Sequence, residues 1–204
     1  MFTRLWLVCG ILASAAYLIA DVGGGLRWPG YSFLDYSISE IAALDTPSRP
    51  FAVKVFALHG VLLAAFVAGV LRGPYPRAAK HAAAFLGLIA VIGAIAAFFP
   101  IRQRGVALSR NEEIHMLLTL ASVLCIVAAM ITGGQSSGRG FRRFSKATIV
   151  MTLFFGAMAG SYAPQLSAGT PTPWLGVVER LSVYSYLLWI AAFANMLLSG
   201  DREH

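Results

Sequence analysis

Charged side chains are scarce in this sequence, and their scarcity decides its class. Only 12% of the residues are charged, whereas a soluble domain normally carries about 25%. Hydrophobic residues make up 58% of the chain, and its mean hydropathy is +0.72. This composition argues against a soluble globular domain and predicts an integral membrane protein.

Cysteine is also rare, and familiar catalytic motifs are missing. The two cysteines, Cys9 and Cys125, both lie inside apolar runs, so their spacing predicts neither a disulfide framework nor a zinc site. The sequence has no nucleophile elbow, no HExxH zinc motif, no P-loop and no Rossmann glycine pattern. Motifs therefore leave it open whether this protein is an enzyme, and they name no cofactor.

The sequence consists mainly of long apolar runs. Each run is close to the roughly 20 residues that a helix needs to cross a membrane. The runs are too long and too uniformly apolar for the strands of a barrel. They predict an all-α, polytopic bundle of six transmembrane helices, in which residues 1–204 form a single domain. The predicted spans are Leu5 to Val22, Phe51 to Leu71, Ala79 to Phe99, Ile114 to Ile131, Ala147 to Ala163, and Leu175 to Leu198.

The first span is predicted to be a retained helix and not a removable signal peptide. Arg4 precedes it, as in a signal peptide, but the run is long enough to span a membrane. No convincing small-residue cleavage site follows it.

Basic residues predict the orientation. The loop between spans two and three carries Arg72, Arg77 and Lys80, and the loop between spans four and five carries four further basic residues (Arg139, Arg142, Arg143 and Lys146). Residues 165–174 carry no Lys or Arg. Because basic loops stay in the cytoplasm, both termini are expected there, in a bacterial inner membrane. Arg102, Arg104 and Arg110 oppose this orientation, because they would lie outside.

The longest polar interruption is Trp28 to Pro47, which lies between the first two spans. Ser37 and Glu40 fit a capping box, in which each side chain bonds the backbone N–H of the other residue. Tyr36 and Ile41 occupy the positions of a hydrophobic staple. We therefore predict a short extracytoplasmic helix from Ile38 to Leu44.

Ionisable residues gather on the predicted outer side, where they suggest a polar pocket. The proposed pocket residues are Ser39, Glu40, His115, Glu179 and Arg180, with Asp21, His59, Arg110 and Tyr162 around them. Polar groups at membrane depth are costly and usually face the bundle interior. A purely structural interpretation stays open for each: a capping role for Glu40, satisfied interior histidines for His59 and His115, and ion pairs such as Glu179–Arg110 or Arg180–Glu40.

No metal is predicted, and three residues are only weak candidates for metal ligands. Glu40, His115 and Glu179 come from separate segments, and their side chains could hold a divalent ion only if the fold brought them together.

Several short motifs in a fixed order identify a relative. They are GYSFLDYSISEIAAL at 30–44, His59-Gly60, Phe99-Pro100, Ile114-His115, and the run Gly176 to Arg180. In this order they resemble the bacterial six-helix membrane family catalogued as domain of unknown function 998. The resemblance covers nearly the whole chain and implies six helices and an inner-membrane location, but no reaction. Its motifs carry over to Ser39, Glu40, His115, Glu179 and Arg180.

These features lead to one functional hypothesis and three rivals. The first is an outer-side pocket that binds a lipid or another amphipathic small molecule. The rivals are a membrane-embedded lipid-modifying hydrolase or transferase, an accessory structural subunit of a larger membrane complex, and a transporter. The transporter is disfavoured, because no paired broken helices are visible. Membrane lipids are the expected partners. Nucleic acid is not expected despite the net charge of +7, and protein partners are unknown.

Overall fold

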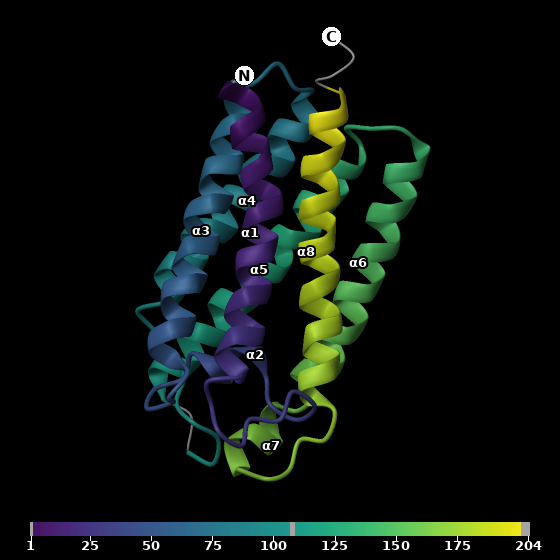
Figure 1. Cartoon of the computed structure of the whole chain (residues 1–204). Helices are drawn as coiled ribbons and strands as arrows, with labels where there is room; N and C mark the ends of the chain where they lie inside the picture. The colour runs from purple at the N-terminus through teal and green to yellow at the C-terminus, as the bar shows by residue number, and fades with distance from the viewer. Residues whose placement is uncertain (1, 107–108, 201–204) are drawn as a thin grey trace.

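The computed structural model describes residues 2–106 and 109–200, and these residues form helices joined by loops, with no β-strand among them (Figure 1). The helices are α1 (Phe2–Gly25), α2 (Ile38–Ile41), α3 (Arg49–Arg72), α4 (Arg77–Ala96), α5 (Arg110–Gly134), α6 (Arg139–Gly160), α7 (Ala163–Ala168) and α8 (Leu175–Gly200). Six helices are long and apolar enough to cross a membrane, which confirms the predicted polytopic helical bundle.

The short helix α2 is the first correction to the sequence prediction. It ends at Ile41 and not at Leu44, because side chains further along capture the carbonyl groups that a longer helix would need. Ser48 Oγ donates to the Ile41 carbonyl oxygen at 2.7 Å, and Thr46 Oγ1 donates to that of Ala43 at 2.9 Å. The Leu44 N–H then donates to the Ile101 carbonyl oxygen at 2.8 Å, so the chain has already left the helix.

The second correction concerns the end of the fifth predicted span. The α6 helix ends at Gly160, and a separate helix, α7, begins at Ala163. Pro164 lies in the first turn of α7, where its missing N–H has no helical partner to lose. The proline therefore belongs to the start of α7 and does not end α6.

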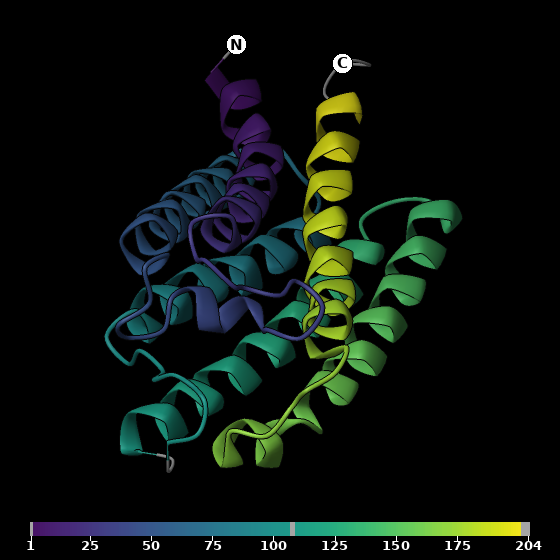
Figure 2. The same cartoon turned by 60° about the horizontal axis from the view of Figure 1, so that its bottom comes forward.

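The six long helices pack in a ring. Each packs mainly against two neighbours, in the order α1, α3, α4, α5, α6, α8 and back to α1 (Figure 2), and α5 also contacts α8. Phe2 and Gly200 lie at one end of the ring, which we call the terminal end (Figure 1). The opposite end, which we call the loop end, carries the loops 26–48, 97–106 and 161–174.

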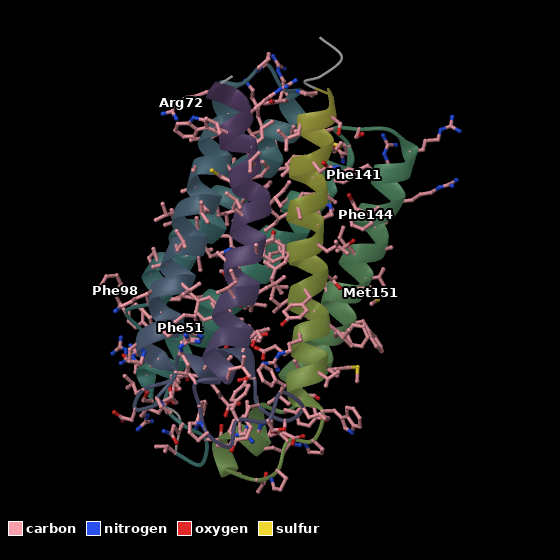
Figure 3. All side chains as sticks on the ribbon, in the orientation of Figure 1. Phe51, Arg72, Phe98, Phe141, Phe144 and Met151 are labelled. Atoms are coloured by element: carbon pink, nitrogen blue, oxygen red, sulfur yellow. The ribbon has the colours of Figure 1, made fainter. Side chains whose placement is uncertain are left out.

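The apolar core fills the half of the bundle near the terminal end. Phe66, Leu63, Trp189 and Phe193 are fully buried there, each 0% exposed. Trp189 and Phe193 stack with ring centroids 5.0 Å apart, and Figure 3 labels Phe141, whose ring stacks on Phe193 from α6 at 6.1 Å. Lipid offers apolar surface of its own, so this close packing holds the helices together mainly by dispersion.

Candidate functional site

The capping box at the start of α2 is present as predicted. Glu40 Oε2 accepts from the Ser37 N–H at 2.8 Å, and Ser37 Oγ accepts from the Glu40 N–H at 3.3 Å. Both side chains are buried, with Ser37 6% and Glu40 3% exposed. Ser39, in the same turn, contributes its carbonyl oxygen to the N–H of Ala42, where the helix ends.

Glu40 is paired with Arg104, a partner that the sequence did not indicate. Arg104 Nε donates to Glu40 Oε1 at 2.7 Å, and its second terminal nitrogen donates to Glu40 Oε2 at 2.7 Å. The pair is bidentate and nearly buried, a geometry that makes charge-assisted hydrogen bonds strong. The predicted pair Arg180–Glu40 is therefore wrong, because another arginine occupies both Glu40 oxygens.

Arg104 also joins the three loops of the loop end. It donates to Thr172 Oγ1 at 3.0 Å and to the Asp35 carbonyl oxygen at 3.2 Å, and its guanidinium lies 4.0 Å from the Tyr36 ring centroid. Burial by itself lowers the pKa of Arg104, but hydrogen bonds to Glu40 and the charge of that carboxylate raise it overall. The guanidinium therefore stays charged and holds the three loops together.

A second buried ion pair links α1 to α8. Arg180 Nε donates to Asp21 Oδ2 at 3.0 Å, and a terminal nitrogen donates to Asp21 Oδ1 at 2.7 Å. Asp21 is 0% exposed and Arg180 is 9% exposed. The Tyr184 hydroxyl adds a third bond to the carboxylate, at 2.5 Å from Asp21 Oδ2. Asp21 therefore does join the polar cluster in which the sequence placed it.

All the N–H groups of Arg180 have acceptors. One terminal nitrogen donates both to Asp21 Oδ1 and to the Tyr31 hydroxyl, each at 2.7 Å. The remaining terminal nitrogen donates to the backbone carbonyl oxygens of Phe33, Tyr36 and Gly176 at 2.9–3.1 Å. Because an arginine has only five N–H donors, none is left for a ligand, and this arginine organises the loop around itself.

Tyr31 completes this arrangement from the loop. Its hydroxyl donates to the Ser37 carbonyl oxygen at 2.9 Å while accepting from Arg180. Burial raises the pKa of Tyr31 well above its usual value, and the nearby Arg180 charge only partly opposes this. The hydroxyl therefore stays protonated and keeps its donor role.

Gly176 explains how the loop approaches α8 so closely. A Cβ atom at this position would lie 2.5 Å from the carbonyl oxygens of both Phe33 and Tyr36. The Gly176 N–H donates to the Leu34 carbonyl oxygen at 2.8 Å. Only glycine allows the backbone of residues 33–36 to lie against the first turn of α8.

Glu179 differs from the other acids at the loop end. Its Oε2 accepts from the Ile38 N–H at 2.5 Å, which anchors the first residue of α2 to α8. Among the described residues it forms no salt bridge, so the predicted pair with Arg110 is wrong. Arg110 is instead an exposed residue at the start of α5.

The remaining predicted residues make contacts of their own. His115 Nδ1 lies 3.0 Å from the Phe99 carbonyl oxygen, and His59 Nδ1 lies 2.9 Å from that of Ala13. The Tyr162 hydroxyl donates to the Pro173 carbonyl oxygen at 2.6 Å, within the loop that leads to α8. In the described part of the chain, no hydrogen bond or ion pair joins His115 to Glu40, Glu179 or Arg180.

These positions bear on the metal-ligand candidates. Over residues 2–106 and 109–200, no three His, Cys, Asp or Glu side chains are grouped so that they could hold a metal ion. Glu40, His115 and Glu179 therefore do not come together as a metal centre in this structure.

A pocket of about 450 Å³ opens beside the Arg180 cluster, between the loop and the outer surface of α8. Its lining includes Leu34, 43% exposed, and Leu181, 40% exposed. The full lining is Ser32, Phe33, Leu34, Val177, Arg180, Leu181 and Tyr184. Of the predicted pocket residues, only Arg180 lies in this lining, because Glu40 and Glu179 are directed to contacts within the fold.

Comparison with known proteins places the chain in a family. No curated protein and no solved structure matches it. The family model described as "Protein of unknown function (DUF998)" matches residues 11–196, which include all six long helices at least in large part. This match confirms the family that the sequence motifs indicated. The chain is a membrane-spanning member of the DUF998 family.

Proposed function

We propose that this protein binds a lipid or another amphipathic small molecule in the pocket beside Arg180. The observation that carries the proposal is the pocket itself, whose volume of about 450 Å³ falls in the range of roughly 300–1,000 Å³ typical of small-molecule sites. It is built on a helix that crosses the membrane, so a molecule already in the bilayer can enter it from the side.

The lining defines the kind of ligand. Phe33, Leu34, Val177 and Leu181 supply apolar contacts, which suit an acyl chain or another hydrocarbon group. The polar atoms of the lining come from Ser32, Arg180 and Tyr184. Their arrangement suits a molecule that has one polar end and an apolar body.

The pairing of Arg180 with Asp21 limits which polar group a ligand can present to this pocket. Arg180 is neutralised by Asp21, and its N–H groups are all engaged within the protein. Because the positive charge of Arg180 is already compensated, it would not attract a phosphate group. The Tyr184 hydroxyl donates to Asp21, so its oxygen is left to accept a hydrogen bond. We infer that the ligand presents a neutral, hydrogen-bonding group such as a hydroxyl.

Native mass spectrometry of protein purified in mild detergent tests the proposal. We expect a co-purified amphiphile on the wild-type protein. It should be lost from Leu181→Trp, because the indole fills the pocket. Leu188→Trp is the matched control, since Leu188 lies two turns further along the same face of α8 and is 61% exposed. Equal retention of the same molecule by all three proteins would overturn the proposal.

The pocket is proposed to lie on the extracytoplasmic side of a bacterial inner membrane. At the terminal end, the basic residues lie in the helix turns that flank the loops 73–76 and 135–138, which favours the cytoplasm. They are Arg72, Arg77, Lys80, Arg139, Arg142, Arg143 and Lys146. At the loop end, Arg102 pairs with Glu112 at 3.0 Å and Arg104 pairs with Glu40. Two of the three arginines that oppose this orientation, Arg102 and Arg104, therefore have local structural roles.

Cysteine labelling of intact cells checks the orientation. In a background without Cys9 and Cys125, a membrane-impermeant thiol reagent should label Ala168→Cys, which lies at the loop end. It should label Gly138→Cys, at the terminal end, only after lysis. Gly138 is exposed, and a Cβ atom there meets nothing within 4 Å. The reverse pattern would place the pocket on the cytoplasmic side.

A further inference from the structure

The first two turns of α6 carry four basic side chains on one side of the helix. They recur at spacings of three and four residues, which places them on a common face, and all four are exposed. The opposite side of α6 packs against α8, where Ser145 Oγ accepts from Trp189 Nε1 at 2.9 Å. The four cations therefore point away from the bundle. We call them the basic face of α6: Arg139, Arg142, Arg143 and Lys146.

No acid in the described part of the chain neutralises the basic face. None of its four side chains forms a salt bridge with a residue that the structure describes, and the first turn of α6 holds no acidic residue. The acidic residues between 2 and 200 lie at the opposite end of the bundle, in the loop-end turns of α1, α5 and α8 and in the loop 26–48. The charge of the basic face is therefore uncompensated within residues 2–106 and 109–200.

This arrangement of charges is unfavourable for the helix itself. Like charges three or four residues apart repel each other. The first turn of a helix is also the positive end of its dipole, where cations are disfavoured. Local rules that are broken without compensation inside a fold are expected at functional positions. The basic face therefore calls for an anion from outside the chain.

The next turns of α6 continue the same side of the helix with apolar residues. Val150, Leu153 and Phe154 follow Lys146 at spacings of three and four residues, so they share its side. They are 65%, 44% and 59% exposed, as expected where a membrane-spanning helix faces lipid. Along this side, a charged segment is thus followed directly by an apolar one, which is the order of groups in a phospholipid.

The length of α6 sets the depth of its basic face in the membrane. From Ala147, just after the last basic residue, to the end of the helix at Gly160, α6 rises about 21 Å. The hydrocarbon core of a bilayer is about 30 Å thick. The basic turns therefore lie at the level of the lipid headgroups, where long basic side chains can reach phosphate groups while their stems stay against hydrocarbon.

We propose that the basic face of α6 binds phospholipids whose headgroups carry a net negative charge. The guanidinium groups of Arg142 and Arg143 donate to the phosphate oxygens, and the acyl chains lie along Val150 and Phe154. A headgroup that also carries an ammonium group is neutral overall, so it gains less from the four cations. This lipid surface lies at the terminal end, so it is separate from the pocket beside Arg180 and does not depend on the function proposed for that pocket.

Fluorescence quenching by brominated lipids tests the proposal. In a background with Cys9→Ser and Cys125→Ser, a bimane label on Val150→Cys reports which lipids lie one turn from the basic face. The protein is reconstituted in phosphatidylcholine vesicles that contain brominated phosphatidylglycerol or, in parallel, the same fraction of brominated phosphatidylcholine. The anionic quencher should bind beside the label more strongly by about fivefold or more, the gain expected from one basic residue near an anionic surface.

A label on α3 is the matched control for local lipid preference. Val61 is 67% exposed, close to the exposure of Val150, but no Lys or Arg lies within one turn of it on its helix. The same label on Val61→Cys should be quenched equally by the two lipids.

Removing two charges distinguishes the basic face from a general attraction of anionic lipid to the terminal end. Arg142→Gln with Arg143→Gln should bring the preference at Val150 close to that at Val61. Arg77→Gln with Lys80→Gln removes the same charge from the first turn of α4 and should leave the preference unchanged. Equal quenching by the two lipids at Val150, an equal preference at Val61, or an equal loss in the α4 variant would each overturn the proposal. The quenching ratio at Val150 needs no change in the basic face, so it decides even if the arginine variant does not fold.

Discussion

The two halves of the bundle are stabilised by different interactions. Near the terminal end the interior is apolar and closed, with Leu63 and Trp189 at 0% exposure. Near the loop end the buried groups include two bidentate ion pairs, Arg180–Asp21 and Arg104–Glu40. The first half is held by close packing, and the second by charges that satisfy each other and hold three loops in place.

This difference distinguishes polar side chains that stabilise the fold from polar side chains that a ligand could contact. In the ion pairs of the loop end, the hydrogen-bond donors and acceptors bond to each other. Most of the charged residues at this end therefore stabilise the fold. What is left for binding is the pocket beside Arg180. A polar cluster in a membrane protein is therefore informative only after its internal hydrogen bonds have been assigned.

The largest effect is expected when an ion pair is broken. Asp21→Ala leaves the Arg180 guanidinium buried without its carboxylate, and it should lower the free energy of unfolding by about 3–5 kcal/mol. Unfolding in a detergent and denaturant titration measures this loss. The control Glu113→Ala, at an exposed position of α5, should change stability by no more than about 0.5 kcal/mol. Similar small losses in both variants would show that the pair does not hold the loop end together.

A cavity in the apolar half should have the next largest effect. Leu63→Ala removes a side chain that is 0% exposed and should cost about 2–4 kcal/mol through lost packing. Leu58→Ala, on the same helix where Leu58 is 50% exposed, should cost far less. Hydrogen exchange in residues 26–48 should stay as in the wild type with Leu63→Ala. Faster exchange there would show that the two halves are not stabilised separately.

The smallest effect is expected at the helix cap. Ser37→Ala removes the Oγ that accepts from the Glu40 N–H, and loss of such a cap typically costs about 1 kcal/mol. Amide exchange at Ile38–Ile41 should rise, while the Arg104 pair keeps the loop in place. Ser39→Ala, in the same turn but outside the capping box, is the control. If both alanine variants exchange alike, the cap adds nothing beyond the ion pair.

Local features of the fold were predictable from the sequence, but pairings between segments were not. The six spans and the Ser37–Glu40 box follow from periodicity and spacing within one segment. The partners of Glu40 and Arg180 depend on how helices rotate and how loops cross, so the predicted pairs Arg180–Glu40 and Glu179–Arg110 were wrong. Arg104 was recognised only as a charge that opposed the predicted orientation.

Gly176 lies in a motif that the sequence indicated, but the sequence did not reveal the role of this glycine. Gly176 stands four residues before Arg180 in a motif that the sequence had already singled out. A Cβ atom at this position would lie 2.5 Å from the carbonyl oxygens of Phe33 and Tyr36, a contact between segments that the sequence alone does not reveal. The motif thus reports a close backbone contact that positions Arg180, as well as the arginine itself.

A structure determined in nanodiscs made from native membranes tests the central claim most directly. We predict elongated density for a bound amphiphile between Leu34 and Leu181, with its polar end near Tyr184, and intact Arg180–Asp21 hydrogen bonds behind it. A pocket closed by its own side chains would contradict the account, as would a ligand that is held by Arg180 in place of Asp21.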